Sequence, residues 1–327
     1  PIVFEDDELE RTWKPENFSQ KFYGPTRMRE AMVNSRNLVS IRLLRDIGIE
    51  YAVDYVTRFG FTRDEIPANL SMALGTASLT PLSMARAYGV FGNGGYLVAP
   101  RYITRITDSG GEVVYRTRPS ITCDECDAEA VQHADSDEAA AEPEFKPLGI
   151  VSDSDAVQST AEAEAAERKP MRTETALAPR VISPQNAYLV RSMMMDVVRR
   201  GTGRRAMELG RRDLAGKTGT TNEQRDAWFS GYNDHLVTTV WVGFDSHEPL
   251  GRNEQGGRAA LPVWIEFMAE ALDGVEESLP VMPDGLAQAR IDPETGLLAP
   301  LASEGTIMEI FEVGRMPPMQ ERADGET

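Results

Sequence analysis

The segment Lys217-Thr218-Gly219-Thr220 places an ammonium group and two hydroxyl groups within four residues. The β-prone run 214–220 predicts that this segment lies on a strand. Beside a strand edge, these groups can hold the acid end of a peptide that pairs along that edge, and Gly219 leaves room for a ligand to approach the backbone. The alternative interpretation is a plain strand with polar surface residues.

A second candidate is the triplet Ser35-Arg36-Asn37, which lies between two predicted helices. A serine hydroxyl can relay a proton, and a nearby amide can orient a bound carbonyl group. The alternative is a helix-capping junction. A Ser-x-Asn triplet is common by chance, so it gains weight only together with the lysine segment.

Hydrophobic periodicity predicts the elements that would position these residues. We expect three short helices between Gly24 and Gly60, with Thr26 as the cap of the first, and a helix from Thr80-Pro81 to Gly94-Gly95. Residues 101–107 and 112–116 flank a glycine-rich tetrapeptide and predict a hairpin.

After the acidic segment (123–168) we expect a helix that starts at Ser183-Pro184, a capping residue followed by a first-turn proline. Three successive strands, 214–220, 226–232 and 236–244, follow with short turns, which favours antiparallel pairing. The last strand is nearly continuously apolar, as expected for a central strand covered on both faces. A final amphipathic helix carries Trp264 and Met268 and stops near Gly274. The pattern predicts an α/β sandwich with an antiparallel sheet.

The acidic side chains are unevenly distributed along the 327 residues. The chain has a formal net charge of −18, and residues 123–168 hold 14 acidic side chains against Lys146 and Arg168. A stretch as polar as this one can bury only little apolar area, which does not offset the conformational entropy lost on folding. We therefore expect a solvated, irregular insert. We therefore predict three regions: 1–120, the acidic insert 121–178, and 179–327. The acidity also excludes nucleic-acid binding as the main function.

The two candidate segments together resemble the S-x-N and K-T-G motifs of penicillin-recognising serine enzymes. Longer stretches, among them KFYGPTRMREAMVNSRNLVSIRLLRDIGIEYA and RRDLAGKTGTTNEQRDAWFSGYN, resemble the transpeptidase domain of class A penicillin-binding proteins, type 1A. The resemblance runs from about residue 1 to residue 315 and weakens over the acidic insert. It implies the penicillin-binding protein/serine β-lactamase-like α/β fold, an antiparallel sheet flanked by helices, truncated at its N-terminal end.

The resemblance implies a peptidoglycan DD-transpeptidase that acts through a serine acyl-enzyme, without a metal or cofactor. Ser35 would shuttle a proton toward the leaving amine, and Asn37 would hold the acyl-side amide of the substrate. Lys217 would supply positive charge near the terminal carboxylate, and Thr218 and Thr220 would donate hydrogen bonds to it. The backbone N–H of Thr220 would form half of an oxyanion hole.

One motif of the family is missing from the chain. The S-x-x-K quartet, which carries the nucleophile and general base, occurs nowhere in the 327 residues. In the family it precedes S-x-N by some tens of residues, so we expect it upstream of Pro1. We predict that the chain alone is catalytically inactive and is a piece of a longer polypeptide.

The resemblance also implies a setting for the longer polypeptide. We expect peptidoglycan stem peptides as substrates, β-lactam antibiotics as inhibitors and an envelope lipoprotein as activator. A glycosyltransferase domain and one membrane anchor upstream would place the enzyme at the periplasmic face of the bacterial inner membrane. Two alternatives remain open, a β-lactamase-like hydrolase and a non-catalytic envelope interaction module that binds through the acidic insert.

For the remaining candidate residues, structural interpretations are favoured over catalytic ones. Cys123 and Cys126 admit a zinc site, a redox pair or a short-range disulfide, and the disulfide is favoured because it suits the oxidising envelope space. The histidines 133, 235 and 247 are interpreted as loop residues. The turn Gly201-Thr202-Gly203 and the loop Gly256-Gly257-Arg258 are interpreted as connections only, and Trp228 as either core or cleft wall.

Overall fold

The computed structural model describes residues 4–6, 11–117, 119–123, 177–300 and 303–320. The chain divides into two compact units, one formed by residues 1–102 and 178–327 and the other by residues 103–177. The candidate site residues 35, 37 and 217–220 all belong to the first unit. In the described part of the chain, no helix is long and apolar enough to cross a membrane.

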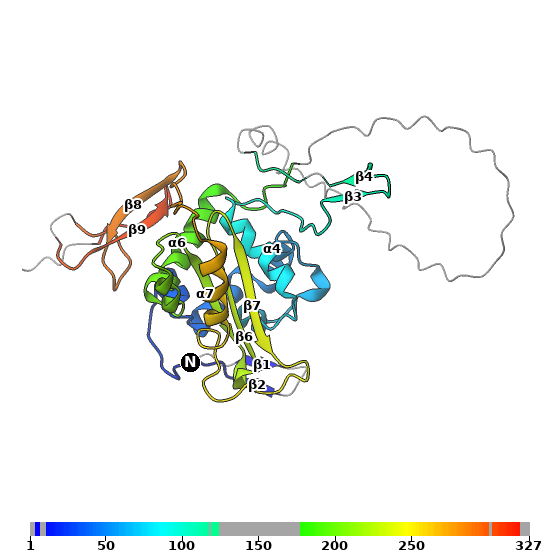
Figure 1. The fold of residues 1–327 in the computed structure, drawn as a ribbon. Helices are drawn as coiled ribbons and strands as arrows, with labels where there is room; N and C mark the ends of the chain where they lie inside the picture. The colour runs from blue at the N-terminus through cyan, green and yellow to red at the C-terminus, as the bar shows by residue number, and fades with distance from the viewer. Residues whose placement is uncertain (1–3, 7–10, 118, 124–176, 301–302, 321–327) are drawn as a thin grey trace, which may run out of the picture. The chain divides into compact units, whose positions relative to one another are not determined.

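The first unit is built on a three-stranded antiparallel sheet (Figure 1). Its strands are β5 (Ala215–Thr220), β6 (Asp226–Tyr232) and β7 (Val237–Gly243), in the order β5-β6-β7. The three predicted strands and their antiparallel pairing are therefore confirmed. The prediction that 236–244 is the central strand is wrong, because β6 lies in the centre. The apolar run of β7 is explained by helix packing on both of its faces rather than by strands on both edges.

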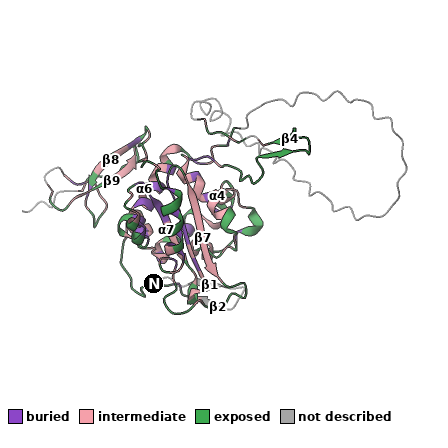
Figure 2. Cartoon of the chain, viewed as in Figure 1, coloured by how far each residue is buried: buried purple, intermediate pink, exposed green. Residues whose placement is uncertain are grey.

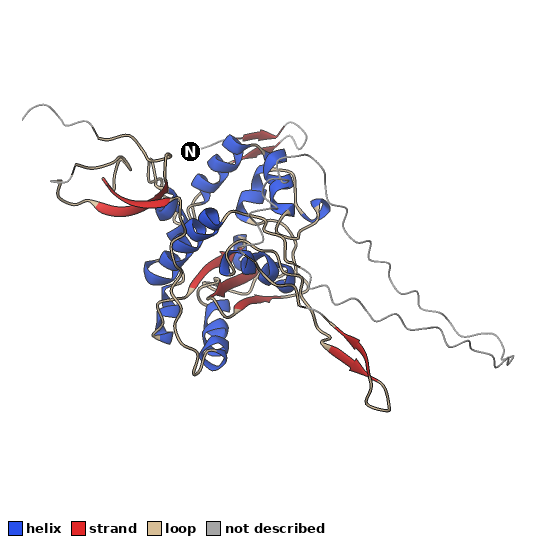
Figure 3. Ribbon diagram, turned by 90° about the horizontal axis from the view of Figure 1, so that it is seen from above, coloured by secondary structure: helices blue, strands red, loops and turns tan. Residues whose placement is uncertain are grey.

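Helices cover both faces of this sheet (Figure 3). They are α4 (Pro81–Gly92) and α6 (Pro184–Arg200) on one face and α7 (Ala260–Ala271) on the other. The predicted caps of α4 and α6 are confirmed, since the hydroxyl of Thr80 accepts the N–H of Ser83 and that of Ser183 accepts the N–H of Asn186.

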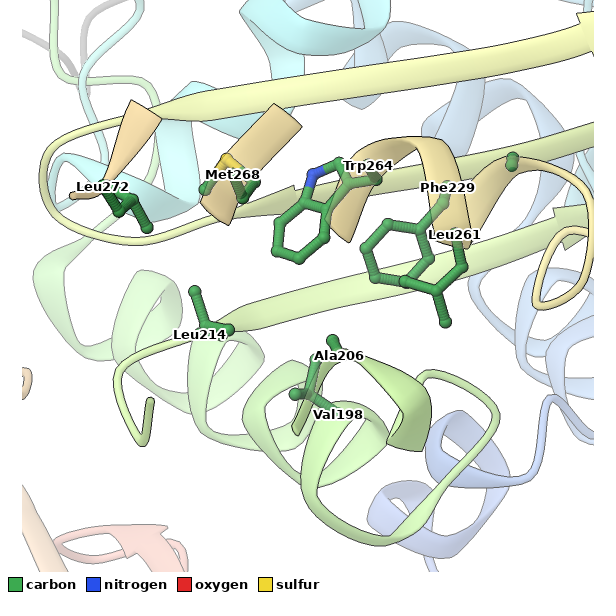
Figure 4. Close-up of a cluster of buried hydrophobic side chains, with 9 residues drawn as sticks. Val198, Ala206, Leu214, Phe229, Leu261, Trp264, Met268 and Leu272 are labelled. Carbon is green, nitrogen blue, oxygen red and sulfur yellow. The ribbon is translucent and has the colours of Figure 1, made fainter. Parts of the chain in front are cut away.

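The core between α7 and the sheet is centred on Trp264 (Figure 4). This side chain is fully buried, packs edge-on against Phe229 at 4.9 Å between ring centroids, and donates its indole N–H to the carbonyl of Thr238. Burial of large aromatic side chains is the main source of stability in such a core. The other buried members of the cluster are Val198, Ala206, Leu214, Ala260, Leu261, Met268 and Leu272.

Three short helices precede α4, as predicted. They are α1 (Met28–Val33), α2 (Asn37–Ile47) and α3 (Ile49–Thr57). The prediction that Thr26 caps α1 is wrong. The N-cap position belongs to Arg27, one residue further on, and the Thr26 hydroxyl donates to the carbonyl of Gly24 instead.

A network of ion pairs fixes α1 to α6 and to the C-terminal hairpin. Arg29 contacts Glu309 at 2.6 Å and Asp196 at 3.3 Å, and Arg200 contacts Glu30 at 2.7 Å. The Arg200 hydrogen bond holds the pKa of the Glu30 carboxyl below its usual value. Because Arg29 and Glu309 are both largely buried, this network orders α1 more strongly than exposed pairs would.

Two hairpins were not predicted. One joins β8 (Leu286–Ile291) to β9 (Ile307–Glu312), and the other joins β1 (Phe4–Asp6) to β2 (Arg11–Trp13). β9 contributes Glu309 to the ion-pair network, so the first of these hairpins helps to position the helical region.

The second unit contains the predicted hairpin as β3 (Arg105–Thr107) and β4 (Val113–Arg116). Both strands are exposed along their whole length (Figure 2). Most of the predicted acidic insert lies outside the described residues, so the division into regions 1–120, 121–178 and 179–327 stays a prediction.

The packing around α7 gives a stability prediction. Trp264→Ala should lower the free energy of unfolding by about 3–5 kcal/mol, because it leaves a large cavity and an unpaired carbonyl. Phe267→Ala, on the same helix but half exposed, is the matched control and should cost less than about 1 kcal/mol. Urea unfolding of both variants measures the difference, and equal losses would contradict this description of the core.

Candidate active site

Strand β5 carries the Lys217-Thr218-Gly219-Thr220 segment along one edge of the sheet. β5 pairs with β6 on one side, and no second strand pairs with it within the described residues. Side chains alternate along a strand, so Lys217 points to the α4/α6 face while Thr218 and Thr220 point to the α7 face. The segment therefore presents its ammonium group and its hydroxyl groups on opposite sides of an edge that can accept a further strand.

Lys217 and Ser35 meet although 182 positions separate them. The Lys217 Nζ donates a hydrogen bond of 2.7 Å to the Ser35 Oγ and a second of 2.9 Å to the carbonyl of Thr218. Ser35 lies in the loop between α1 and α2 with φ of 51°, a left-handed conformation that is uncommon for residues other than glycine. Such a conformation persists only where the surrounding structure holds it, and such residues cluster at functional sites.

The electrostatic environment of Lys217 is unusual for a lysine. No carboxylate lies within ion-pair distance of its ammonium group in the described ranges, and burial lowers the pKa of Lys217 to about 8. Near neutral pH the protonated form of Lys217 dominates, and a rise of about one pH unit is enough to produce a large fraction of the neutral amine. A lysine poised in this way next to a serine hydroxyl can pass a proton in either direction.

A polar row continues from Lys217 across the sheet. Lys217 pairs in register with Ser230 on β6, and Ser230 pairs with Thr239 on β7. The Ser230 hydroxyl is buried and lies 2.9 Å from that of Thr239. This row could not be predicted from the sequence, because a serine and a threonine on separate strands carry no signal until the register is known.

The hydroxyl of Thr220 is held by the loop before α7. The N–H of Gly256 donates to the Thr220 Oγ1 at 3.0 Å. A Cβ atom at Gly256 would overlap the carbonyl oxygens of Gly219 and Trp228, so only glycine allows this close approach. The Gly256-Gly257 pair, interpreted from the sequence as a connection only, thus supports the lysine-bearing strand.

Asn37 is the first residue of α2 and does not hydrogen-bond to the lysine–serine pair. Its amide Nδ2 donates to the carbonyl of Glu16 at 2.9 Å. This contact ties α2 to the preceding segment, but the N-cap of α2 is Arg36 and its side chain makes no capping hydrogen bond, so the capping alternative is wrong. The role of Asn37 toward a substrate amide stays a prediction.

Trp228 stands opposite Gly219 on the face of the sheet that also carries Lys217. It is half-buried and packs against Trp241, with 6.1 Å between ring centroids. The indole N–H of Trp241 in turn donates to Asp226. Trp228 therefore borders the lysine edge rather than lying in the closed core.

The histidines and cysteines take no part in the lysine–serine hydrogen bond. His235 and His247 are exposed loop residues, as interpreted, whereas His133 and Cys126 lie outside the described residues. Cys123 is disulfide-bonded, and its pairing with Cys126 stays a prediction. Among the described residues, no group of three or more histidine, cysteine or acidic side chains could hold a metal ion.

The sheet is antiparallel and lies between helices, and a lysine on its edge strand donates a hydrogen bond to a serine from the helical region. This arrangement is that of the penicillin-binding protein fold. The chain belongs to the penicillin-binding protein transpeptidase domain family, whose family model matches residues 3–268.

Its relatives are consistent with the type 1A resemblance. The chain is 46% identical to penicillin-binding protein 1A of Pseudomonas aeruginosa and 36% identical to that of Vibrio cholerae, with 97% of this chain covered in each case. The crystal structure of penicillin-binding protein 1A from Haemophilus influenzae matches with a TM-score of 0.79 and 34% identity, over 98% of this chain and 45% of that chain. The chain spans 38% and 37% of the length of the two relatives from P. aeruginosa and V. cholerae.

The lysine environment gives a prediction that requires no substrate. In protein with 13C-labelled lysine, Lys217 should titrate near pH 8, well below the ordinary value of a lysine side chain. Ser35→Ala should lower the Lys217 pKa further, because the Ser35 oxygen accepts a hydrogen bond that favours the charged form.

Lys217→Arg identifies the resonance, and Ser40→Ala, which alters an exposed serine on α2, is the control. A midpoint near 10.5 for Lys217, or a midpoint that Ser35→Ala leaves unchanged, would contradict the described environment.

Proposed function

We propose that this chain is the major part of the DD-transpeptidase domain of a type 1A class A penicillin-binding protein, which cross-links peptidoglycan stem peptides through a serine acyl-enzyme. The observation that carries the proposal is the 2.7 Å hydrogen bond between Lys217 and Ser35. It joins the K-T-G strand to the S-x-N loop at the edge where a peptide substrate would pair.

The open edge of β5 supports binding of an extended peptide. A stem peptide that ends in D-Ala-D-Ala would add alongside β5 by main-chain hydrogen bonds. Lys217 supplies positive charge near the terminal carboxylate, and the hydroxyls of Thr218 and Thr220 donate to it. The backbone N–H of Thr220 contributes to the oxyanion hole, and Asn37 holds the acyl-side amide.

The lysine–serine pair supports proton transfer during acylation. The attacking serine gives its hydroxyl proton to the general base of the S-x-x-K motif and forms an ester with the acyl carbon, while the amide bond to the terminal residue breaks. Ser35 gives its proton to the leaving amine nitrogen, and the ammonium of Lys217 returns a proton to Ser35. Lys217 regains its charge by taking up the proton that the general base received, so no net proton is lost. A lysine with a pKa of about 8 is suited to this exchange near neutral pH.

The nucleophile and general base come from a segment outside these 327 residues. No Ser-x-x-Lys quartet occurs in the chain, and Ser35 is assigned to proton transfer rather than attack. We therefore propose that the chain alone forms no acyl-enzyme and that the S-x-x-K motif is supplied from upstream.

The setting proposed for the longer polypeptide is the one that the type 1A resemblance implies. It includes a glycosyltransferase domain, a membrane anchor, β-lactam inhibitors and an activating envelope lipoprotein, at the periplasmic face of the inner membrane. A β-lactamase-like hydrolase is the second enzymatic alternative. It would release hydrolysed β-lactam rapidly, whereas a transpeptidase would keep the acyl group for much longer.

The first functional prediction concerns Lys217 in the longer polypeptide. Lys217→Ala should reduce the second-order rate constant of acylation by a fluorescent penicillin roughly 100-fold or more, because an electrostatic donor and the Ser35 partner are lost together. The acylation rate should also fall as the pH rises through about 8, where Lys217 loses its proton.

Lys21→Ala is the matched control, since Lys21 is an exposed lysine in the irregular segment before α1. An acylation rate that Lys217→Ala leaves unchanged would contradict the proposed role.

A second prediction concerns the 327-residue chain by itself. Incubated with the fluorescent penicillin, it should show no covalent label in denaturing gels, because it contains no Ser-x-x-Lys quartet. The longer polypeptide, tested in parallel, should be labelled. Labelling of the isolated chain would mean that one of its own serines is the nucleophile.

A further inference from the structure

The turn that follows α6 contains a third hydroxyl group beside the lysine-bearing strand. The hydroxyl of Thr218 donates a hydrogen bond of 2.8 Å to the Oγ1 of Thr202. Thr202 is the middle residue of the Gly201-Thr202-Gly203 turn, which from the sequence was interpreted as a connection only. Its side chain is exposed, so a ligand at this edge can reach it.

Backbone contacts hold this turn in place. The N–H of Thr202 donates to the carbonyl of Val33, and the N–H groups of Gly201 and Gly203 both donate to the carbonyl of Val197. A Cβ atom at Gly201 would lie 2.5 Å from the Val33 oxygen, so this position requires glycine for close packing. Thr202 is therefore fixed to the end of α1, two residues before Ser35, as well as to β5.

The loop before α7 supports the same group of residues from the other side. A Cβ atom at Gly257 would lie 3.2 Å from the carbonyl oxygen of Thr202, and the N–H of Gly256 donates to the hydroxyl of Thr220. Three hydroxyls, those of Thr202, Thr218 and Thr220, are thus anchored at the same end of the strand.

The directions of these hydrogen bonds determine which hydroxyl groups can still donate a hydrogen bond to a ligand. Each threonine hydroxyl has one proton to donate. The hydroxyl of Thr218 donates its one hydrogen bond to Thr202, and the hydroxyl of Thr220 accepts a hydrogen bond from the N–H of Gly256. The protons that this arrangement leaves available for an anion are those of Thr202 and Thr220.

We propose that Thr202 is a further substrate-binding residue, which donates a hydrogen bond to the carboxylate of the peptide or penicillin together with Thr220, while Thr218 orients the Thr202 hydroxyl. This inference rests on the proposed function, since it assumes that a carboxylate-bearing ligand binds at the β5 edge. It adds a contact from outside the K-T-G segment, and this contact replaces the hydrogen bond that the resemblance assigns to Thr218, whose one proton is donated to Thr202.

The test compares two ligands that differ only in the carboxylate. The longer polypeptide, wild-type and variant, is acylated by a penicillin with a free carboxylate and by the methyl ester of the same penicillin. Thr202→Val keeps the side-chain shape but removes the hydroxyl, and it should lower the acylation rate constant about ten-fold or more for the acid. For the ester the change should stay below about two-fold.

Two further variants separate binding from structure. Thr202→Ser restores a hydroxyl and should recover the rate with the acid. Thr107→Val, which alters an exposed threonine on β3, is the matched control and should leave both rates unchanged. Thermal unfolding of each variant checks that the fold is kept.

The outcomes distinguish the inference from the proposed function. Equal rate losses with acid and ester, no loss with either, or no recovery with Thr202→Ser would overturn the role of Thr202 while leaving the transpeptidase proposal intact. A wild-type polypeptide that is not acylated, or one in which Lys217→Ala has no effect, would overturn both.

Discussion

The hydrogen bond between Lys217 and Ser35 is the contact on which the arrangement of this molecule depends. A half-buried ammonium group without a carboxylate partner is costly unless neutral oxygen atoms accept its hydrogen bonds. The Ser35 hydroxyl and the Thr218 carbonyl fill that role. The loop between α1 and α2 must therefore lie against β5, and the rest of the first unit can be understood as the means of holding it there.

Helix α6 provides most of that support. On one side its Met194 and Met195 pack against Ala215 at the start of β5. On another side Asp196 and Arg200 pair with charged residues of α1, and the turn after α6 bonds to the last residue of α1. One rigid element thus fixes both the strand that carries the lysine and the helix that leads to the serine. Such support allows Ser35 to keep a left-handed backbone conformation.

Local features of the fold could be predicted from the sequence, whereas long-range contacts could not. Thr80-Pro81 and Ser183-Pro184 start helices through their own caps, and two β-prone runs separated by a short turn within 214–232 predict two strands. The meeting of Lys217 and Ser35 was expected only from the family resemblance, since no local pattern joins residues 182 apart. Thr202 and Gly256 were missed because their importance lies in contacts with distant backbone. The apolar run in β7 was misinterpreted because helix packing and strand neighbours both favour apolar residues.

The most direct test of the central claim is a double-mutant cycle on acylation of the longer polypeptide by penicillin, with Ser35→Ala, Lys217→Ala and the double variant. If the two residues act as one unit, the double variant should be no more impaired than the worse single variant, with a coupling free energy above about 1 kcal/mol. If the two losses simply multiply, the lysine and the serine act independently, and the contact does not have the role assigned to it.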